Sequence, residues 1–363
     1  MPADLYARGF MNILIVSGFL GAGKTTFIKE LIRRTGTNPV ILENEYGDNS
    51  IDARELRATA SGEKKLEVLE FMEGCVCCTM KDSFVNSVLT VFSGLSPEYL
   101  VIEPTGVGKL SNIINNLTPI LHENITLLNP IAVIAPRSFD ANMSEFGVLY
   151  RDQVANAKTV VFSKCENESP EIIKKTVAAI KDINPDAQIV SDHYTRQGDE
   201  WWRSVMAPAG KEITTVLDSA DTEFFSQLTL NNARLDNPAQ LVSLLEDCLR
   251  GELGLVARAK GTIPVGGESL RFDLADGLYT ISGSYESDME FDGNNADSDG
   301  ISVETDINST YSDGISVETD RTSNQCVFIG KELDKEGICG RLGCTLDALD
   351  FSLAKAYVRR ARK

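Results

Sequence analysis

The sequence predicts an α/β fold with a mostly parallel sheet, followed by a smaller α+β domain. Short apolar runs alternate with helical patterns over the first half of the chain, and short strands with glycine turns follow from about Phe224. Strands that alternate with helices favour βαβ units and a parallel sheet. We expect the first domain over residues 1–195, a linker over 196–222, and the second domain over 223–363 with an acidic insertion at about 284–321.

The first strand is predicted over Asn12–Ser17, a β-branched run (N-I-L-I-V-S) that ends in a glycine-rich turn. A helix is predicted over Thr25–Arg34, because its apolar residues recur at helical spacing on one side. The later strands of this domain are expected over Val40–Leu42, Tyr99–Ile102, Ile131–Ala135 and Thr159–Phe162, with helices over Asp82–Phe92 and Pro170–Ile183.

The second domain is expected to begin with a helix over Pro238–Leu249. Its strands are predicted over Leu255–Ala259, Leu278–Ser282 and Cys326–Ile329, and a last helix over Leu346–Arg362.

Charge excludes two classes of partner. The chain has 53 Asp and Glu against 35 Lys and Arg, a net charge of −18, whereas nucleic acids and anionic membranes need a basic face. Thirteen of the acids lie in Phe272–Asp320, and without that segment the net charge is −5. No apolar run approaches the roughly 20 residues that span a bilayer. Since Met1–Phe10 also lacks an apolar signal core, we expect a cytoplasmic protein with no membrane partner.

Residues Gly18–Thr25 (G-F-L-G-A-G-K-T) match the phosphate-loop pattern, between a predicted strand and a predicted helix. Glycines let backbone N–H groups turn inward around phosphates, and the helix adds its positive N-terminal end. In this pattern Lys24 reaches the β- and γ-phosphates and the Thr25 hydroxyl ligates Mg²⁺. The sequence therefore predicts a P-loop NTPase domain that binds nucleotide through Gly18, Gly21, Ala22, Gly23, Lys24, Thr25 and Thr26.

Two further strand ends complete the predicted nucleotide site. Glu103 ends one strand and is expected to hold the Mg²⁺ water shell, while the N–H of Gly106 senses the γ-phosphate. Another strand ends in Ser163-Lys164-Cys165-Glu166, where many P-loop GTPases carry Asn-Lys-x-Asp. The Glu166 carboxylate can accept hydrogen bonds from guanine N1–H and N2–H₂, which adenine does not offer. We therefore predict that the chain binds GTP.

Three cysteines, Cys75, Cys77 and Cys78, crowd into four residues. This spacing is poor for a disulfide framework and suits thiolate ligands in a reducing compartment. Thiolates favour a soft or borderline ion such as Zn²⁺, Co²⁺, Ni²⁺ or Cu⁺. A fourth ligand from another segment, or an open transfer position, is expected to complete the site.

The motifs G-F-L-G-A-G-K-T-T, E-N-E-Y-G-D, G-C-V-C-C, E-P-T-G and S-K-C-E, in this order, resemble those of the CobW-type GTPases. These are metallochaperones related to nickel-insertion GTPases. Val256–Gly261 and Val327–Lys331 resemble the second domain of that family. The resemblance implies slow GTP hydrolysis with Mg²⁺, binding of a transition metal (Zn²⁺ or Co²⁺), and its delivery to a client metalloprotein or cofactor pathway.

The resemblance also assigns residues by motif. Cys77 is the first candidate metal ligand, and Glu43 and Asp48 belong to a switch-like loop that lends oxygen ligands. Asp52 in the same loop approaches Mg²⁺ or the attacking water, which makes Lys24, Glu103 and Asp52 the candidate catalytic residues. No arginine finger is identifiable in the nucleotide motifs, and a nucleotide-dependent homodimer is compatible with this assignment.

Two other functions remain open at this stage. A regulatory G-protein switch for a metalloenzyme or a corrinoid-dependent partner would use structural or redox-active cysteines and transfer no metal. An ATP-dependent kinase could use the same phosphate loop, although no nucleobase or sugar acceptor site is evident.

The acidic insertion contains two copies of S-D-G-I-S-V-E-T-D, at Ser298–Asp306 and Ser312–Asp320. Around the first copy, positions 1, 3, 5, 6 and 12 of an EF-hand calcium loop are matched by Asn295, Asp297, Asp299, Gly300 and Asp306. The second copy fails at positions 1 and 3, and no helix pattern flanks either copy. A surface loop or a β-hairpin extension is therefore favoured over a calcium site.

Overall fold

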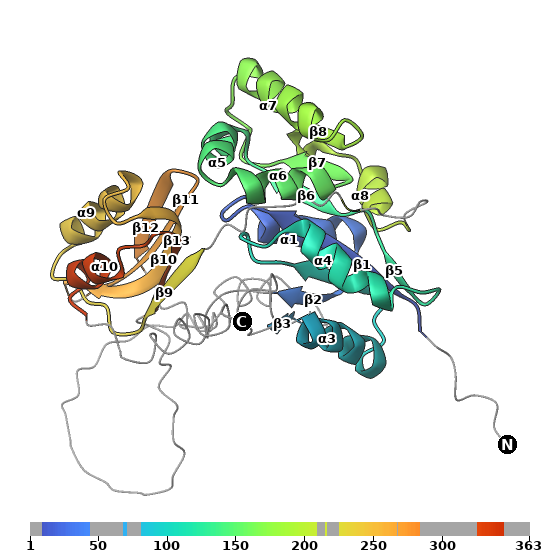
Figure 1. Cartoon of the computed structure of the whole chain (residues 1–363), viewed down its shortest axis with the longest axis horizontal. Helices are drawn as coiled ribbons and strands as arrows, with labels where there is room; N and C mark the ends of the chain where they lie inside the picture. Colours follow the sequence, from blue (N-terminus) through green and yellow to red (C-terminus); the bar gives the residue numbers. More distant parts are fainter. Residues whose placement is uncertain are drawn as a thin grey trace, which may run out of the picture.

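The computed structural model describes residues 9–43, 68–70, 81–208, 215, 225–266, 268–283 and 325–344. Figure 1 shows two sheets, one built from the N-terminal half of the chain and one from the C-terminal part. No helix in the described ranges has the length and apolar character needed to cross a bilayer.

The first sheet contains eight strands among the described residues, and every pairing between them is parallel. The strands are β1 (Met11–Gly18), β2 (Val40–Glu43), β3 (Val68–Glu70), β4 (Tyr99–Glu103), β5 (Ile125–Leu127), β6 (Ile131–Ile134), β7 (Thr159–Phe162) and β8 (Gln188–His193). Their order is β3-β2-β4-β1-β6-β7-β8, with β5 also paired to β1. The carboxyl ends of these parallel strands, and the loops that follow them, therefore lie along one edge.

Helices cover both faces of this sheet. One apolar core packs α1 (Lys24–Thr35) and α8 (Asp199–Val205) against the sheet through Phe27, Leu31 and Trp202. The other core includes residues of α3 (Lys81–Gly94), α4 (Leu110–Leu117), α5 (Phe139–Glu145), α6 (Gly147–Asn156) and α7 (Pro170–Ile183). Because both faces are covered, the central strands β1, β4, β6 and β7 are buried along nearly their whole length, in agreement with their apolar sequences.

The second sheet is antiparallel, in the order β12-β11-β10-β13-β9. Its elements in chain order are β9 (Ser226–Leu230), α9 (Pro238–Leu249), β10 (Leu255–Val265), β11 (Glu268–Ala275), β12 (Leu278–Gly283), β13 (Gln325–Lys331) and α10 (Lys335–Arg341). A third apolar core joins one face of this sheet to α9 and α10. A capping box between Asn237 and Gln240 fixes the start of α9, which places its apolar side over the sheet.

The predicted fold class is confirmed, and the predicted strands of the first sheet agree with β1, β2, β4, β6 and β7 to within one residue at each end. The sequence analysis did not identify β3, β5, β8, β9 or β11. The predicted helix over Leu346–Arg362 and the acidic repeats lie outside the described residues, as do 13 of the 27 residues of the predicted linker. The described part of that linker contains α8.

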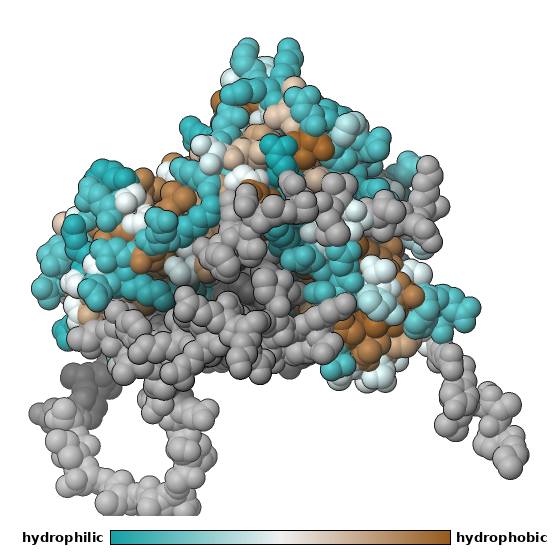
Figure 2. All heavy atoms as spheres, viewed as in Figure 1, coloured by the Kyte–Doolittle hydropathy of each residue, from teal (hydrophilic) through white to brown (hydrophobic). Residues whose placement is uncertain are grey.

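Side chains on the described surface in Figure 2 are mostly hydrophilic. An apolar area lies over α3, where Leu89 and Leu95 are exposed.

Candidate functional site

The phosphate-loop residues form a tight turn between β1 and α1. Gly21 and Gly23 have φ of 76° and 90°, a left-handed backbone that glycine adopts without strain. Gly23 is also the N-cap of α1, and no side chain caps that helix end. The first N–H groups of α1 therefore face the turn without a side-chain acceptor, which suits an anion.

Lys24 and Thr25 begin α1, and the Thr25 side chain contacts the end of β4. The Lys24 side chain is 6% exposed, and its Nζ donates to the backbone oxygen of Phe19 at 3.3 Å. The Thr25 hydroxyl donates to Glu103 Oε1 at 2.9 Å. A hydroxyl and a carboxylate in direct contact are the hard oxygen ligands that Mg²⁺ prefers.

Ser163 supports the phosphate loop from the neighbouring strand end. Its hydroxyl is buried at the end of β7 and donates to the backbone oxygen of Ala22 at 2.6 Å. Ser163 thus holds the turn in place, and neither Ser163 nor Ala22 lines the cavity beside it.

The loop after β4 packs directly on the phosphate loop. The amide of Gln153, which is fully buried, donates to the backbone oxygens of Gly106 and Gly108 at 3.0 and 3.1 Å. A Cβ on Gly106 would lie 2.4 Å from the backbone nitrogen of Leu20. Gly106 therefore packs closely against the phosphate loop. It does not line the cavity that opens in front of that loop.

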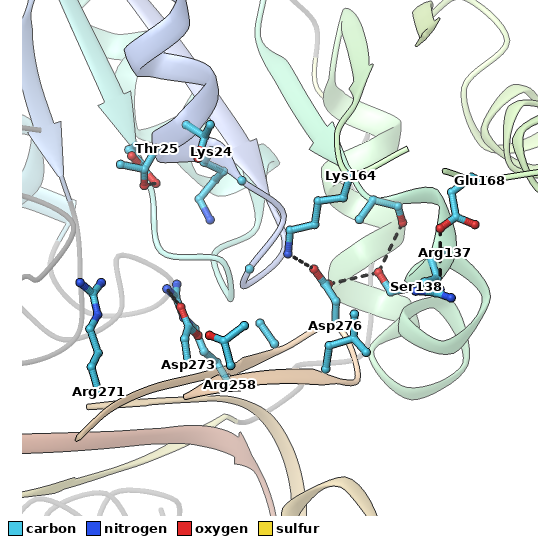
Figure 3. Close-up of a pocket in the computed structure, with 18 residues that line it drawn as sticks. Lys24, Thr25, Arg137, Ser138, Lys164, Glu168, Arg258, Arg271, Asp273 and Asp276 are labelled. Carbon is cyan, nitrogen blue, oxygen red and sulfur yellow. Dashed lines mark hydrogen bonds and ion pairs between the residues drawn. The ribbon is translucent and has the colours of Figure 1, made fainter. Parts of the chain in front are cut away.

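A cavity of about 450 Å³ opens between the two sheets, in front of the phosphate loop (Figure 3). The structure brings many of the predicted nucleotide residues together along its wall: Gly21, Gly23, Lys24, Thr25, Thr26, Glu103 and Lys164. The opposite wall comes from the second domain, from strands that the sequence analysis did not connect with this site.

The hairpin between β11 and β12 reaches into this cavity. Asp276 and Gly277 at its tip have φ of 55° and 71°, as in a two-residue turn of type I′. The Asp276 carboxylate is 2.8 Å from Lys164 Nζ and accepts from the Ser138 hydroxyl at 3.1 Å. At the same tip, a Cβ on Gly21 would lie 2.3 Å from the Cβ of Ala275. An Asp-Gly pair favours such a turn, but no local pattern shows what the turn contacts.

Two carboxylates follow Lys164, and they point to different places. Lys164 itself has a left-handed φ of 51°, and the Glu168 N–H donates to the Cys165 oxygen at 3.2 Å. This turn carries Glu166 to His193, 3.1 Å away and outside the cavity, where the Glu166 side chain is 53% exposed. Glu168 instead lines the cavity, with a side chain 10% exposed and 3.7 Å from Arg137. Sequence spacing favoured Glu166, and Glu168 was not among the predicted residues.

Glu43 is buried at the end of β2 and lies beside Glu103 in the strand register. A buried lysine from the second domain, Lys260, is close enough for their charges to interact. Burial lowers the pKa of Lys260 to about 8, a shift that Asp273 and Glu43 oppose and that Arg271 and Lys24 increase. Charges from both domains therefore meet at this edge of the first sheet.

The remaining predicted residues lie outside the described ranges: Asp48, Asp52, Cys75, Cys77 and Cys78. Within the ranges that are described, no group of three or more histidines, cysteines or acids is arranged to hold a metal ion. The metal-ligand assignment, including Glu43, stays a prediction.

The described geometry defines a nucleotide-binding domain of the P-loop class. Comparison with protein families agrees, since residues 12–191 match "CobW/HypB/UreG, nucleotide-binding domain". This part of the chain belongs to the CobW/HypB/UreG family.

Curated relatives are similar to part of the chain. The chain is 32% identical over 160 residues to the zinc chaperone YeiR of Escherichia coli, covering 43% of this chain and 47% of that protein. It is 25% identical over 219 residues to zinc-regulated GTPase metalloprotein activator 1 of Dictyostelium discoideum, covering 50% and 46%. The chain thus spans about half the length of the curated relatives it matches.

Solved structures are more distant. The Zn(II)-bound YjiA GTPase from E. coli aligns with 92% of this chain and 98% of its own, at 16% identity and a TM-score of 0.40. The hydrogenase maturation factor HypB from Archaeoglobus fulgidus aligns with 53% and 86%, at 18% identity and a TM-score of 0.39.

Proposed function

We propose that this protein is a GTP-hydrolysing metallochaperone, which binds a transition metal, Zn²⁺ or Co²⁺, and delivers it to a client metalloprotein. The observation that carries the nucleotide part is the contact between Thr25 and Glu103 beside the buried Lys24. The names of its curated relatives, which include zinc chaperones, support the metal part. A homodimer that forms in the presence of nucleotide fits the same proposal.

In this function, Lys24 and the first N–H groups of α1 bind the phosphates. Thr25 and Glu103 would hold Mg²⁺, which neutralises charge on the β- and γ-phosphate oxygens when bound. Asp52 is proposed to position the attacking water. Because Gly106 packs on the phosphate loop, a change at the γ-phosphate can pass to the loop after β4.

The guanine base is proposed to lie at the Lys164 end of the cavity. Its N1–H and N2–H₂ donors need a carboxylate there, and Glu168 lines the cavity whereas Glu166 turns away to His193. We therefore expect Glu168→Gln to weaken GTP binding by about tenfold, the worth of a lost charge-assisted hydrogen bond. The matched variant Glu166→Gln should change it by less than about threefold. Competition experiments with GTP, ITP and ATP would measure the nucleotide affinities of the two variants. A larger loss of GTP affinity in Glu166→Gln than in Glu168→Gln would assign guanine recognition to Glu166.

For the metal, Cys75, Cys77 and Cys78 are the proposed thiolate ligands, and Glu43 and Asp48 the oxygen donors. Since Glu43 ends the strand beside Glu103, a metal bound by Glu43 would sense the nucleotide through adjacent strand ends. Hydrolysis would then relax the metal site and favour release.

The decisive experiment measures Zn²⁺ and Co²⁺ affinity of anaerobically purified protein with GDP and with a non-hydrolysable GTP analogue. We expect tighter binding with the GTP analogue and at least tenfold weaker binding for Cys77→Ser, because a thiolate ligand is lost. Cys248→Ser is the matched control, since burial raises the pKa of that thiol to about 12 and keeps it protonated. A metal affinity that is the same with either nucleotide and unchanged in Cys77→Ser would contradict the proposal. Partner binding that depends on GTP but not on chelators would point to the regulatory switch instead.

A further inference from the structure

β10 and β11 carry charged side chains on the face of the second sheet that is turned away from α9 and α10. Arg258 and Lys260 on β10, and Arg271 and Asp273 on β11, alternate with buried residues of the core beneath those helices. Lys260 pairs in register with Asp273, and successive side chains of a strand point to opposite faces. The four charges therefore share one face.

That face lies over the nucleotide cavity. Arg258 and Arg271 line the same cavity as Lys24, Thr25 and Glu103. Figure 3 shows both guanidinium groups pointing from the second sheet toward the phosphate loop. Asp273 lies 3.4 Å from the Arg258 guanidinium, so its carboxylate can orient that side chain.

Five basic and four acidic side chains line the cavity, which gives it a slight excess of positive charge. Lys24 lines one wall of the cavity and the two arginines line the other. Lys260, on the same strand as Arg258, is only 7% exposed. Bringing like charges together in a partly buried space is unfavourable unless an opposite charge lies between them. The acids of the cavity wall supply part of that opposite charge, and the phosphates of a bound nucleotide would add more between Lys24 and the arginines.

Two contacts fix the position of the second sheet, and both lie at the end of the sheet where β10 begins. At the hairpin tip, Asp276 contacts Lys164 and Ser138 of the first domain. At the end of β13, Lys331 donates to the backbone oxygen of Glu145 at 2.6 Å and lies 4.9 Å above the ring of Phe146. The two arginines therefore lie on paired strands, β10 and β11, of a sheet that contacts the first domain.

We propose that Arg258 and Arg271 contact the phosphates of the bound nucleotide from the second domain and stabilise the charge that develops during hydrolysis. The proposal rests on GTP hydrolysis, the proposed function, and it makes the second domain an intramolecular activator of the first. Guanidinium groups suit this role because they remain charged and bind phosphate oxygens in a bidentate manner.

The chemical step is the hydrolysis of the terminal phosphoanhydride. Water attacks the γ-phosphorus and forms a new P–O bond, while the bond from that phosphorus to the β,γ-bridging oxygen breaks. The electron pair of the broken bond stays on the oxygen of GDP, and inorganic phosphate and a proton are released. Negative charge grows on the bridging and γ-oxygens in the transition state, where the two guanidinium groups can neutralise it.

The double variant Arg258→Ala/Arg271→Ala tests the proposal in the full-length protein. We expect its kcat for GTP to fall roughly 10²- to 10³-fold, within or just below the range for a lost arginine finger. Its affinity for GDP should change by less than about threefold, and its affinity for GDP with aluminium fluoride, a transition-state mimic, should fall with kcat. Arg234→Ala is the matched control, because Arg234 is an exposed arginine of the same domain that does not line the cavity.

Unchanged kcat in a double variant that folds would overturn the proposal. So would a parallel loss of GDP affinity and kcat, which would assign the arginines to domain docking. If the alanine variant fails to fold, Arg258→Lys/Arg271→Lys keeps the charge but loses the bidentate geometry, and its kcat should still fall at least about tenfold. A wild-type protein that binds GTP and does not hydrolyse it would instead contradict the proposed function.

Discussion

Replacing Lys24 with alanine is expected to lower GTP turnover by about 10³-fold or more, through loss of the cation at the β- and γ-phosphates. The side chain is almost fully buried, and its Nζ is held by the backbone oxygen of Phe19, inside the turn that Gly21 and Gly23 create. No solvent cation can reproduce that position. Single-turnover hydrolysis and binding of a fluorescent GTP analogue would measure the effect on chemistry and on affinity separately.

Lys175→Ala is the control for this prediction. Lys175 is 69% exposed on α7 and forms an ion pair with Asp140, so its removal takes away a surface charge far from the phosphate loop. Exposed ion pairs contribute about 1 kcal/mol or less, and turnover should remain at the wild-type level. Hydrolysis that survives in Lys24→Ala would mean that nucleotide is processed at a different site.

Gly106→Ala is expected to damage both the stability of the fold and nucleotide binding. The added Cβ would lie 2.4 Å from the backbone nitrogen and 2.7 Å from the Cα of Leu20. Neither side can yield easily, because Ser163 holds the phosphate loop and Gln153 holds the Gly106 carbonyl. We expect a loss of about 3 kcal/mol in the free energy of unfolding and at least tenfold weaker GTP binding.

Chemical denaturation and nucleotide titration would measure both effects. Gly94→Ala is the matched change, since a Cβ there meets no atom within 4 Å and the residue ends a helix. It should leave stability unchanged or slightly raised. Equal stability and equal GTP affinity of the two variants would show that the loop after β4 can move away from the phosphate loop.

The phosphate loop could be predicted because all of its determinants are adjacent in the chain. Glycines at the turn, Lys24 and Thr25 form a local pattern, and the apolar run before them fixes the strand. The carboxylate beside Lys164 was harder to assign, because the choice between Glu166 and Glu168 depends on a left-handed backbone at Lys164. Spacing alone does not reveal such a turn.

The second wall of the cavity was not predicted, for a different reason. The alternation in β11, with Arg271 and Asp273 between apolar neighbours, is visible in the sequence as a strand with one polar face. That face lies opposite a segment more than 200 residues away in the chain, since Arg271 lines the same cavity as Lys24. No local pattern encodes such a pairing, so the sequence analysis found no arginine finger.

The buried lysine has a thermodynamic consequence. Because burial lowers the pKa of Lys260 from its ordinary 10.5 to about 8, the folded protein must hold a disfavoured charge at every pH below about 8. This destabilisation fades as the pH rises from about 8 to 10.5, where the unfolded chain also loses the proton.

A bound anion near Lys260 would lower the free-energy cost of the buried charge. Ligand binding and folding are then linked by mass action. A ligand at 100 times its Kd adds about 2.7 kcal/mol to the free energy of unfolding. The cellular nucleotide pool would then act as a stabiliser of this fold.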